Sequence, residues 1–347
     1  MRTAFSDVVG NERLRARLYA DLKERSLAHA YILEGAPGSG KHLLASRIAM
    51  ALSCENSHSE AYPLPCLQCP SCRKIASGNS PDVIYVNRDE KHATVGVELI
   101  RELRKDVYIA PNELQIKTYV IEEAHLMTEA AQNAFLLTLE EPPSYVFFLL
   151  LCESSSKLLE TVKSRAPILR TEQIPPEEIA DFLSKSRPDA ALLRRQEPKE
   201  FAELVTASQG SIGTALRLLD PKLRAPILAR RSMAKEFAML CTSRKNAAAT
   251  MRFLNALPQR REKREELSLL LDSFLLCLRD LLLCKQTDEA PLCFFADREE
   301  AFSLSYRFTT PELLSLCECI SDAQEQLRAN ANIRLLLTSF AARCNLL

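Results

Sequence analysis

Short apolar runs alternate with longer amphipathic runs over the first half of the chain. Five apolar runs have the length and composition of strands, at residues 30–33, 83–86, 118–121, 146–152 and 168–169. Between them, apolar residues recur at helical spacing over residues 43–52, 97–107 and 129–139. Because strands that alternate with helices form parallel sheets covered on both faces, the pattern predicts an α/β domain with a parallel five-stranded sheet.

The pattern changes after Ile174-Pro175-Pro176, where strand-like runs disappear. A small helical segment is predicted up to residue 220, and the remainder is predicted to be all-helical, with leucine-rich stretches at 267–283 and 333–344. We therefore expect three domains, at residues 1–172, 173–220 and 221–347.

Composition and charge narrow the class of protein. The chain has 347 residues, of which 47% are hydrophobic, with 45 basic and 45 acidic side chains. These values exclude a disordered protein and one that coats nucleic acid by bulk charge. The longest apolar run, residues 145–152, is too short to span a bilayer, so we expect no membrane insertion. No secretory signal precedes the 12 cysteines, which favours a reducing cytoplasm.

A glycine-rich segment follows the first predicted strand. Residues 35–42 have the sequence Gly-Ala-Pro-Gly-Ser-Gly-Lys-His and lead into a predicted helix. This strand-to-helix context indicates a phosphate-binding loop, whose glycines let backbone N–H groups approach phosphate oxygens. A glycine-rich turn without function is the alternative. The residues expected to contact ATP are Gly35, Gly38, Ser39, Gly40, Lys41 and His42.

Two features argue against efficient hydrolysis of that ATP. His42 stands where Ser or Thr normally places a hydroxyl on Mg²⁺, and imidazole is a poor ligand for so hard a cation. After the third predicted strand, Glu122 takes the metal-side position where Asp is usual, and Glu123 takes the position that polarises an attacking water. Two acidic residues after a strand more often lie at a strand end exposed to solvent. The phosphate loop upstream favours the interpretation that Glu122 and Glu123 belong to the ATP site.

Four cysteines lie in a proline-rich insertion that follows the helix predicted over residues 43–52. They are Cys54, Cys66, Cys69 and Cys72. This spacing predicts one structural Zn²⁺ held by four thiolates, which leave no open position for catalysis. Free buried thiols are the alternative for the four cysteines, and His58 is the alternative to Cys54 as a ligand.

These motifs occur in an order that resembles bacterial clamp-loader subunits of the AAA+ superfamily, most closely those of the delta-prime type from DNA polymerase III. The matching segments are residues 5–10, 29–31, the phosphate loop, the cysteine insertion, 80–82, 122–125, 133–143 and Ser164-Arg165. The resemblance implies an AAA+ domain at 1–172, a small three-helix lid at 173–220, and a helical collar at 221–347 that joins a five-subunit ring.

The resemblance also implies roles and partners. Arg165 corresponds to an arginine finger that acts in trans on ATP held by a neighbouring subunit. The implied partners are the tau/gamma and delta subunits, with the sliding clamp and primer-template DNA engaged through the complex. The sensor-1 position falls at Cys152 or Glu153, and Gly213 stands where ATPase relatives carry a sensor-2 arginine, so the chain's own ATPase is expected to be weak or absent.

Two other functions are alternatives for this sequence. A tau/gamma-type ATPase, or another autonomous AAA+ ATPase, would use the same phosphate loop but needs an intact hydrolysis site. A zinc-dependent nucleic-acid-binding protein is disfavoured because the cysteine loop lacks interleaved aromatic or basic residues.

Overall fold

The computed structural model describes residues 5–24, 26–59, 61–88, 94–242, 247–257, 263–287, 289 and 292–346. The chain divides into two compact units. The first extends to Glu178 and includes Ser211–Thr214, and the second comprises Ile179–Gly210 and Ala215–Leu347. The three-domain division, with separate lid and collar, stays a prediction.

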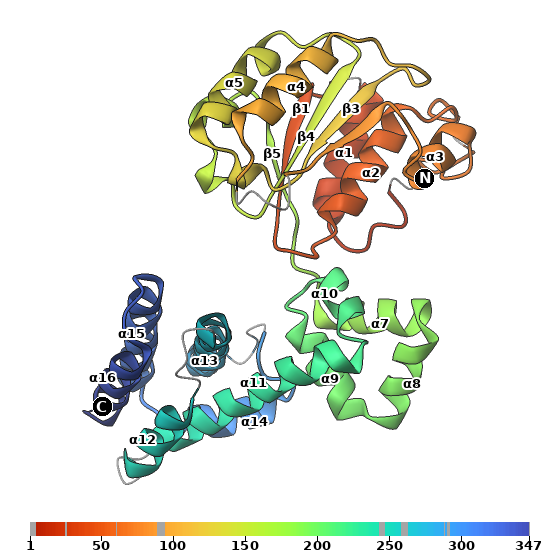
Figure 1. Ribbon diagram of the computed structural model, residues 1–347. Coiled ribbons are helices and arrows are strands. Elements are labelled where there is room, and N and C mark those ends of the chain that lie inside the picture. The colour runs from red at the N-terminus through yellow and green to blue at the C-terminus, as the bar shows by residue number, and fades with distance from the viewer. Residues whose placement is uncertain are drawn as a thin grey trace. The chain divides into compact units, whose positions relative to one another are not determined.

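The first unit is built on a parallel sheet with the strand order β2-β3-β4-β1-β5 (Figure 1). Each neighbouring pair of strands is parallel. All five predicted strands are confirmed, each to within one residue of its expected bounds. They are β1 (Ala30–Glu34), β2 (Val83–Val86), β3 (Lys117–Ile121), β4 (Val146–Cys152) and β5 (Ile168–Arg170).

Both faces of the sheet are covered by helices, as the alternation of strands and helices predicts. One face packs against α1 (Glu12–Glu24) and α2 (Lys41–Leu52), and the other against α4 (Val97–Val107) and α5 (Glu129–Glu140). All seven residues of β4 are buried because successive side chains enter opposite cores. Phe147, Leu149 and Leu151 join the α1–α2 core, whereas Phe148, Leu150 and Cys152 join the α4–α5 core.

Shorter elements complete the first unit. The cysteine insertion contains α3, and the segment between β4 and β5 contains α6. The bounds are α3 (Pro70–Ala76), α6 (Glu160–Lys163) and the 3-10 turns η1 (Ala124–Leu126) and η2 (Ser155–Lys157).

The rest of the described chain is helical. Four helices lie in the range where a three-helix lid is predicted, one more than expected, because Gln209 and Gly210 adopt left-handed φ values of 51° and 79° and a separate short helix follows them. The helices are α7 (Pro176–Ser186), α8 (Pro188–Gln196), α9 (Pro198–Ala207), α10 (Ile212–Arg217), α11 (Pro221–Cys241), α12 (Ala247–Ala256), α13 (Arg264–Gln286), α14 (Arg298–Ser305), α15 (Thr310–Arg328) and α16 (Ile333–Leu346).

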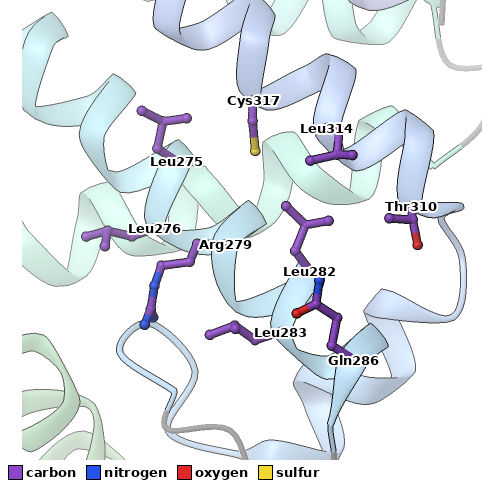
Figure 2. A pocket seen from close by; sticks show the side chains of 9 residues that line it. All are labelled: Leu275, Leu276, Arg279, Leu282, Leu283, Gln286, Thr310, Leu314 and Cys317. Carbon is purple, nitrogen blue, oxygen red and sulfur yellow. The ribbon is translucent and has the colours of Figure 1, made fainter.

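The helices from α11 onward share one core, in which the rings of Phe237 and Phe274 stack at 4.4 Å. An apolar groove of about 430 Å³ runs between α13 and α15. Figure 2 shows Leu282 on the α13 side and Leu314 and Cys317 on the α15 side. Among the helices that the structure describes, none combines the length and apolar character needed to cross a membrane.

Candidate functional site

The predicted phosphate loop connects β1 to α2. Gly38 and Gly40 have φ values of 73° and 88°, which glycine adopts without the strain that a side chain would bring. A Cβ atom on Gly35 would lie 1.8 Å from Oγ1 of Thr171, so this position also requires glycine. The loop therefore places the N-terminus of α2, with its free backbone N–H groups, at the carboxyl edge of the sheet.

The lysine of the loop is folded onto the loop itself. Lys41 Nζ donates hydrogen bonds to the carbonyl oxygens of Gly35, at 2.5 Å, and Ala36, at 3.1 Å. The residue is 7% exposed, and burial lowers the pKa of its ammonium group although Glu153 acts in the opposite direction. A phosphate group would be an alternative acceptor for the same ammonium protons.

The segment around Gly213 lies against the tip of the phosphate loop. Its backbone N–H donates to the carbonyl oxygen of Gly38 at 3.1 Å, and Ser211 Oγ donates to that of Pro37 at 3.3 Å. A Cβ atom at Gly213 would lie 2.8 Å from the Gly38 carbonyl oxygen. No side chain fits at position 213 in this arrangement.

Both predicted acids lie beside the loop, and each has a basic partner. Nδ1 of His42 is 3.2 Å from Oε1 of Glu122, and Nε of Arg88 is 2.6 Å from Oε2 of Glu123. Arg88 and Asn87 follow β2 and line a polar cavity of about 320 Å³ together with the two acids. The pairing of Arg88 with Glu123 was not predicted, because residues 35 positions apart meet only through the parallel pairing of β2 with β3.

Mg²⁺ does not fit this arrangement. A hard cation in this position needs oxygen ligands, and the residue after Lys41 offers an imidazole whose Nδ1 lies 3.2 Å from Oε1 of the metal-side acid. Glu123 also has a left-handed backbone, with φ of 48°, which is uncommon for a residue with a side chain. Binding of Mg²⁺ with ATP in this chain's own site therefore stays a prediction.

The four cysteines of the insertion form a cluster that could hold a metal ion. Their sulfur atoms all lie within 4.8 Å of one another, and all four residues are buried. The sulfur atoms of Cys66 and Cys72 are 3.9 Å apart, close to the edge of about 3.8 Å for a tetrahedron with Zn–S bonds of about 2.3 Å. His58 is exposed and outside the cluster. The cluster thus fits the predicted structural Zn²⁺.

Backbone groups prepare one of these sulfurs for a cation. Burial raises the pKa of Cys66, but N–H groups of Gln68 and Cys69 and the amide of Asn56 outweigh it and lower the pKa to about 6. Burial raises the pKa values of Cys54 and Cys72. A bound Zn²⁺ would keep all four sulfurs as thiolates and would close the insertion onto the α1–α2 core, which already includes these cysteines.

Arg165 lies just beyond α6, and its guanidinium is one-third exposed. Nη1 donates to the carbonyl oxygen of Thr161 at 3.0 Å and to Ser164 Oγ at 3.2 Å, and Nη2 donates to Oε1 of Glu140 at 2.8 Å. The guanidinium thus has a defined orientation and is accessible from outside the chain.

Two buried polar residues that support these segments were not predicted as functional. Gln132 on α5 is 3% exposed, and its amide bonds to the backbone of Met127, Lys157 and Leu159, which ties the turn after β3 to the segment leading into α6. Asp82 is fully buried and accepts three backbone N–H bonds of 2.7–2.8 Å from residues 112–114. The one indication of the role of Gln132 in the sequence is that it interrupts an otherwise apolar helix face.

The sheet order, the phosphate loop after β1 and the acids after β3 define the first unit as an AAA+ domain. Residues 10–175 match the family described as DNA polymerase III, delta subunit. This match and the curated relatives described next support a clamp-loader subunit of the AAA+ superfamily.

Similar proteins carry related names. The chain is 33% identical over 216 residues to DNA polymerase III subunit tau of Bacillus subtilis, covering 62% of this chain and 37% of that protein. It is 34% identical over 220 residues to subunit tau/gamma of Haemophilus influenzae, covering 62% of this chain and 30% of that one. The match thus spans about a third of the length of these curated relatives.

Solved structures are similar at a lower level. A DNA polymerase III gamma subunit-related protein from Thermotoga maritima is 17% identical, with 94% of this chain and 98% of that chain covered and a TM-score of 0.40. The Bacillus subtilis DNA clamp loader delta protein is 13% identical, with 96% and 99% covered and a TM-score of 0.35. TM-scores this low add nothing to the assignment.

Proposed function

We propose that this chain is a delta-prime-type subunit of a DNA polymerase III clamp loader. In this role it helps to place a sliding clamp on primer-template DNA and supplies Arg165 to ATP bound by a neighbouring tau/gamma subunit. The observation that carries the proposal is the contrast between two sites. In the chain's own site the His42 imidazole stands where a hydroxyl is usual and lies 3.2 Å from Glu122, whereas the Arg165 guanidinium is oriented and accessible.

An arginine finger acts by stabilising negative charge on the transferring phosphoryl group. In well-studied systems it contributes about 10³–10⁵ in rate. Because the planar guanidinium donates in a fork that the lysine ammonium lacks, Arg165→Lys is expected to fail as Arg165→Ala does. Neither substitution touches the helices from α11 to α16, so the complex is expected to assemble normally.

The test is a clamp loader reconstituted with tau/gamma, delta, clamp and primed DNA from the same organism. Single-turnover measurements count the ATP molecules hydrolysed per complex. With Arg165→Ala, the hydrolysis phase that belongs to one site is expected to slow by about 10³ or more. Arg170→Ala is the matched control, because this exposed arginine pairs with Glu34 of its own chain. An intact complex with unchanged hydrolysis and clamp loading would refute the proposed role.

A tau/gamma-type ATPase is the second candidate, favoured by the retained loop glycines with Lys41 and by the names of the similar curated proteins. The isolated chain distinguishes the two functions. A motor subunit hydrolyses ATP with multiple turnovers that rise with clamp and primed DNA, whereas a delta-prime-type subunit shows no such stimulation.

A further inference from the structure

The strand β2 lies at one edge of the sheet, with β3 as its single neighbouring strand among the described residues. The carbonyl oxygens of Asp82 and Val86 accept hydrogen bonds from N–H groups of the β3 segment, at 2.8 and 3.1 Å. Successive backbone groups of a strand point in opposite directions, so the N–H and C=O groups of Tyr85 point away from β3. These two groups are directed at the outer edge of the sheet.

This edge lacks the side chains that usually prevent a sheet edge from pairing. Natural proteins often protect such edges with charged residues or proline. The strand has the sequence Val-Ile-Tyr-Val, and Tyr85 is 40% exposed. An apolar edge strand with unprotected backbone groups can pair with a further extended segment.

A groove of about 350 Å³ lies between this edge and α4. Ile84 and Val86 of β2 line one side and belong to the core that includes α4. Leu99 and Leu103 line the other side, one turn apart on α4. Because both sides are apolar, the groove can take an apolar side chain from a segment that pairs with β2.

The charged residues that line the groove are both acidic. Glu102 and Asp106 lie one turn apart on α4, and Glu102 is exposed without a partner among the described residues. Lys117 Nζ and the hydroxyl of Tyr119 both bond to Oδ2 of Asp106, which leaves its Oδ1 for another donor. Two carboxylates beside an apolar groove attract a cationic side chain and repel the phosphates of a nucleic acid.

We propose that the open edge of β2 and this groove bind an extended segment of a partner protein that carries an apolar side chain and, two positions along, a lysine or arginine. The segment pairs with the backbone of Tyr85 as a further strand. Side chains two positions apart lie on the same face of a strand, so both enter the groove. The apolar one packs between Ile84 and Leu103, and the cation lies beside Glu102 and Asp106. This proposal does not depend on the role of Arg165.

Selection from a display library of short random peptides, with the full chain as target, tests the proposal. The enriched peptides are expected to contain the apolar and basic residues two positions apart, and one of them is synthesised with a fluorescent label. With Glu102→Arg, its dissociation constant in an anisotropy titration is expected to rise about tenfold or more, because an attraction becomes a repulsion. Glu98→Arg, at an exposed acid of the same helix outside the groove, is the matched control.

Tyr85→Pro tests the strand pairing itself. Proline removes the outward N–H of this edge position but no hydrogen bond to β3, so the sheet is expected to form. Peptide binding is expected to weaken by about tenfold or more while the circular dichroism spectrum is unchanged. If this variant does not fold, the charge reversal at Glu102 still decides the proposal.

Three results would overturn the proposal. The first is a library from which no peptide is enriched, and the second is an enriched peptide whose affinity neither folded variant changes. The third is a concentration-dependent dimer of the unmodified chain in sedimentation that Tyr85→Pro dissociates, because the edge would then pair with a second copy of the chain.

Discussion

Glu140 accepts a hydrogen bond from Nη2 of Arg165, and its substitution tests how much this contact matters to the trans role proposed for Arg165. Glu140→Gln keeps the size and one oxygen acceptor of the side chain but removes its charge. Arg165 would keep its bonds to the Thr161 carbonyl and to Ser164 Oγ. We therefore expect the variant to fold and assemble, and to lower the rate of the hydrolysis phase that depends on Arg165.

The size of the effect follows from exposure. The side chains of Arg165 and Glu140 are 34% and 46% exposed, so their 2.8 Å contact is an exposed ion pair screened by water. Such pairs contribute about 0.2–1 kcal/mol. If all of this energy orients the guanidinium, the rate falls by roughly 1.4- to 5-fold. That is far smaller than the loss of about 10³ or more expected for Arg165→Ala.

The assay is a double-mutant cycle in the reconstituted clamp loader, with the rate of the Arg165-dependent phase as the readout. Glu140→Gln is expected to slow this phase in the unmodified background and to have no further effect in Arg165→Ala. Glu141→Gln, at the adjacent exposed acid, is the matched control. A loss as large as that of Arg165→Ala, or an equal loss in both backgrounds, would refute the positioning role. If Arg165→Ala itself has no effect, the proposed function fails before this role is tested.

Two further predictions concern the stability of the first unit. Metal analysis of protein purified under reducing conditions is expected to find about one Zn²⁺ per chain. The Cys69→Ser variant is expected to lose most of this Zn²⁺, and its free energy of unfolding is expected to fall by more than about 2 kcal/mol. Metal-free protein of unchanged stability would contradict the zinc site. Asp82→Ala removes the shared acceptor of three part-buried N–H groups, so a loss of about 1–3 kcal/mol is expected in denaturant unfolding. Burial raises the pKa of Asp82, but the N–H groups of Asn112, Leu114 and Glu113 outweigh it and lower the pKa below its unfolded value of 3.8. The contribution of Asp82 to stability is therefore complete above that value and is lost as the pH falls through its lower folded pKa, a pH dependence that Asp82→Ala should lack.

The sheet could be predicted from the sequence because its signals are local. The seven consecutive apolar residues Val146–Cys152 indicate a central strand, because a strand in the middle of a covered parallel sheet is buried on both faces. The glycines and Lys41 of the phosphate loop likewise form one continuous segment. The cysteine cluster was predictable for the same reason, because three of its four ligands lie within seven residues.

The pairings that decide the chemistry were not predictable, because they join distant segments. Arg88 meets Glu123 across 35 positions and Arg165 meets Glu140 across 25. Nothing in either local sequence identifies the partner. The number of helices between residues 173 and 220 was hard to predict for a different reason, since the six residues of α10 are too few to show a helical period.

The changes in the chain's own site reinforce one another, which limits what a single reversion can restore. His42→Ser would remove the imidazole beside Glu122, but Arg88 would still pair with Glu123. An arginine at position 213 would have to displace the loop, because even a Cβ atom there lies 2.8 Å from the Gly38 carbonyl oxygen. A site with the usual hydrolysis residues would thus need changes at the loop, at β2 and at the segment that packs on the loop. The contacts of Arg165 involve none of these segments, so the trans role proposed for it does not require hydrolysis at the chain's own site.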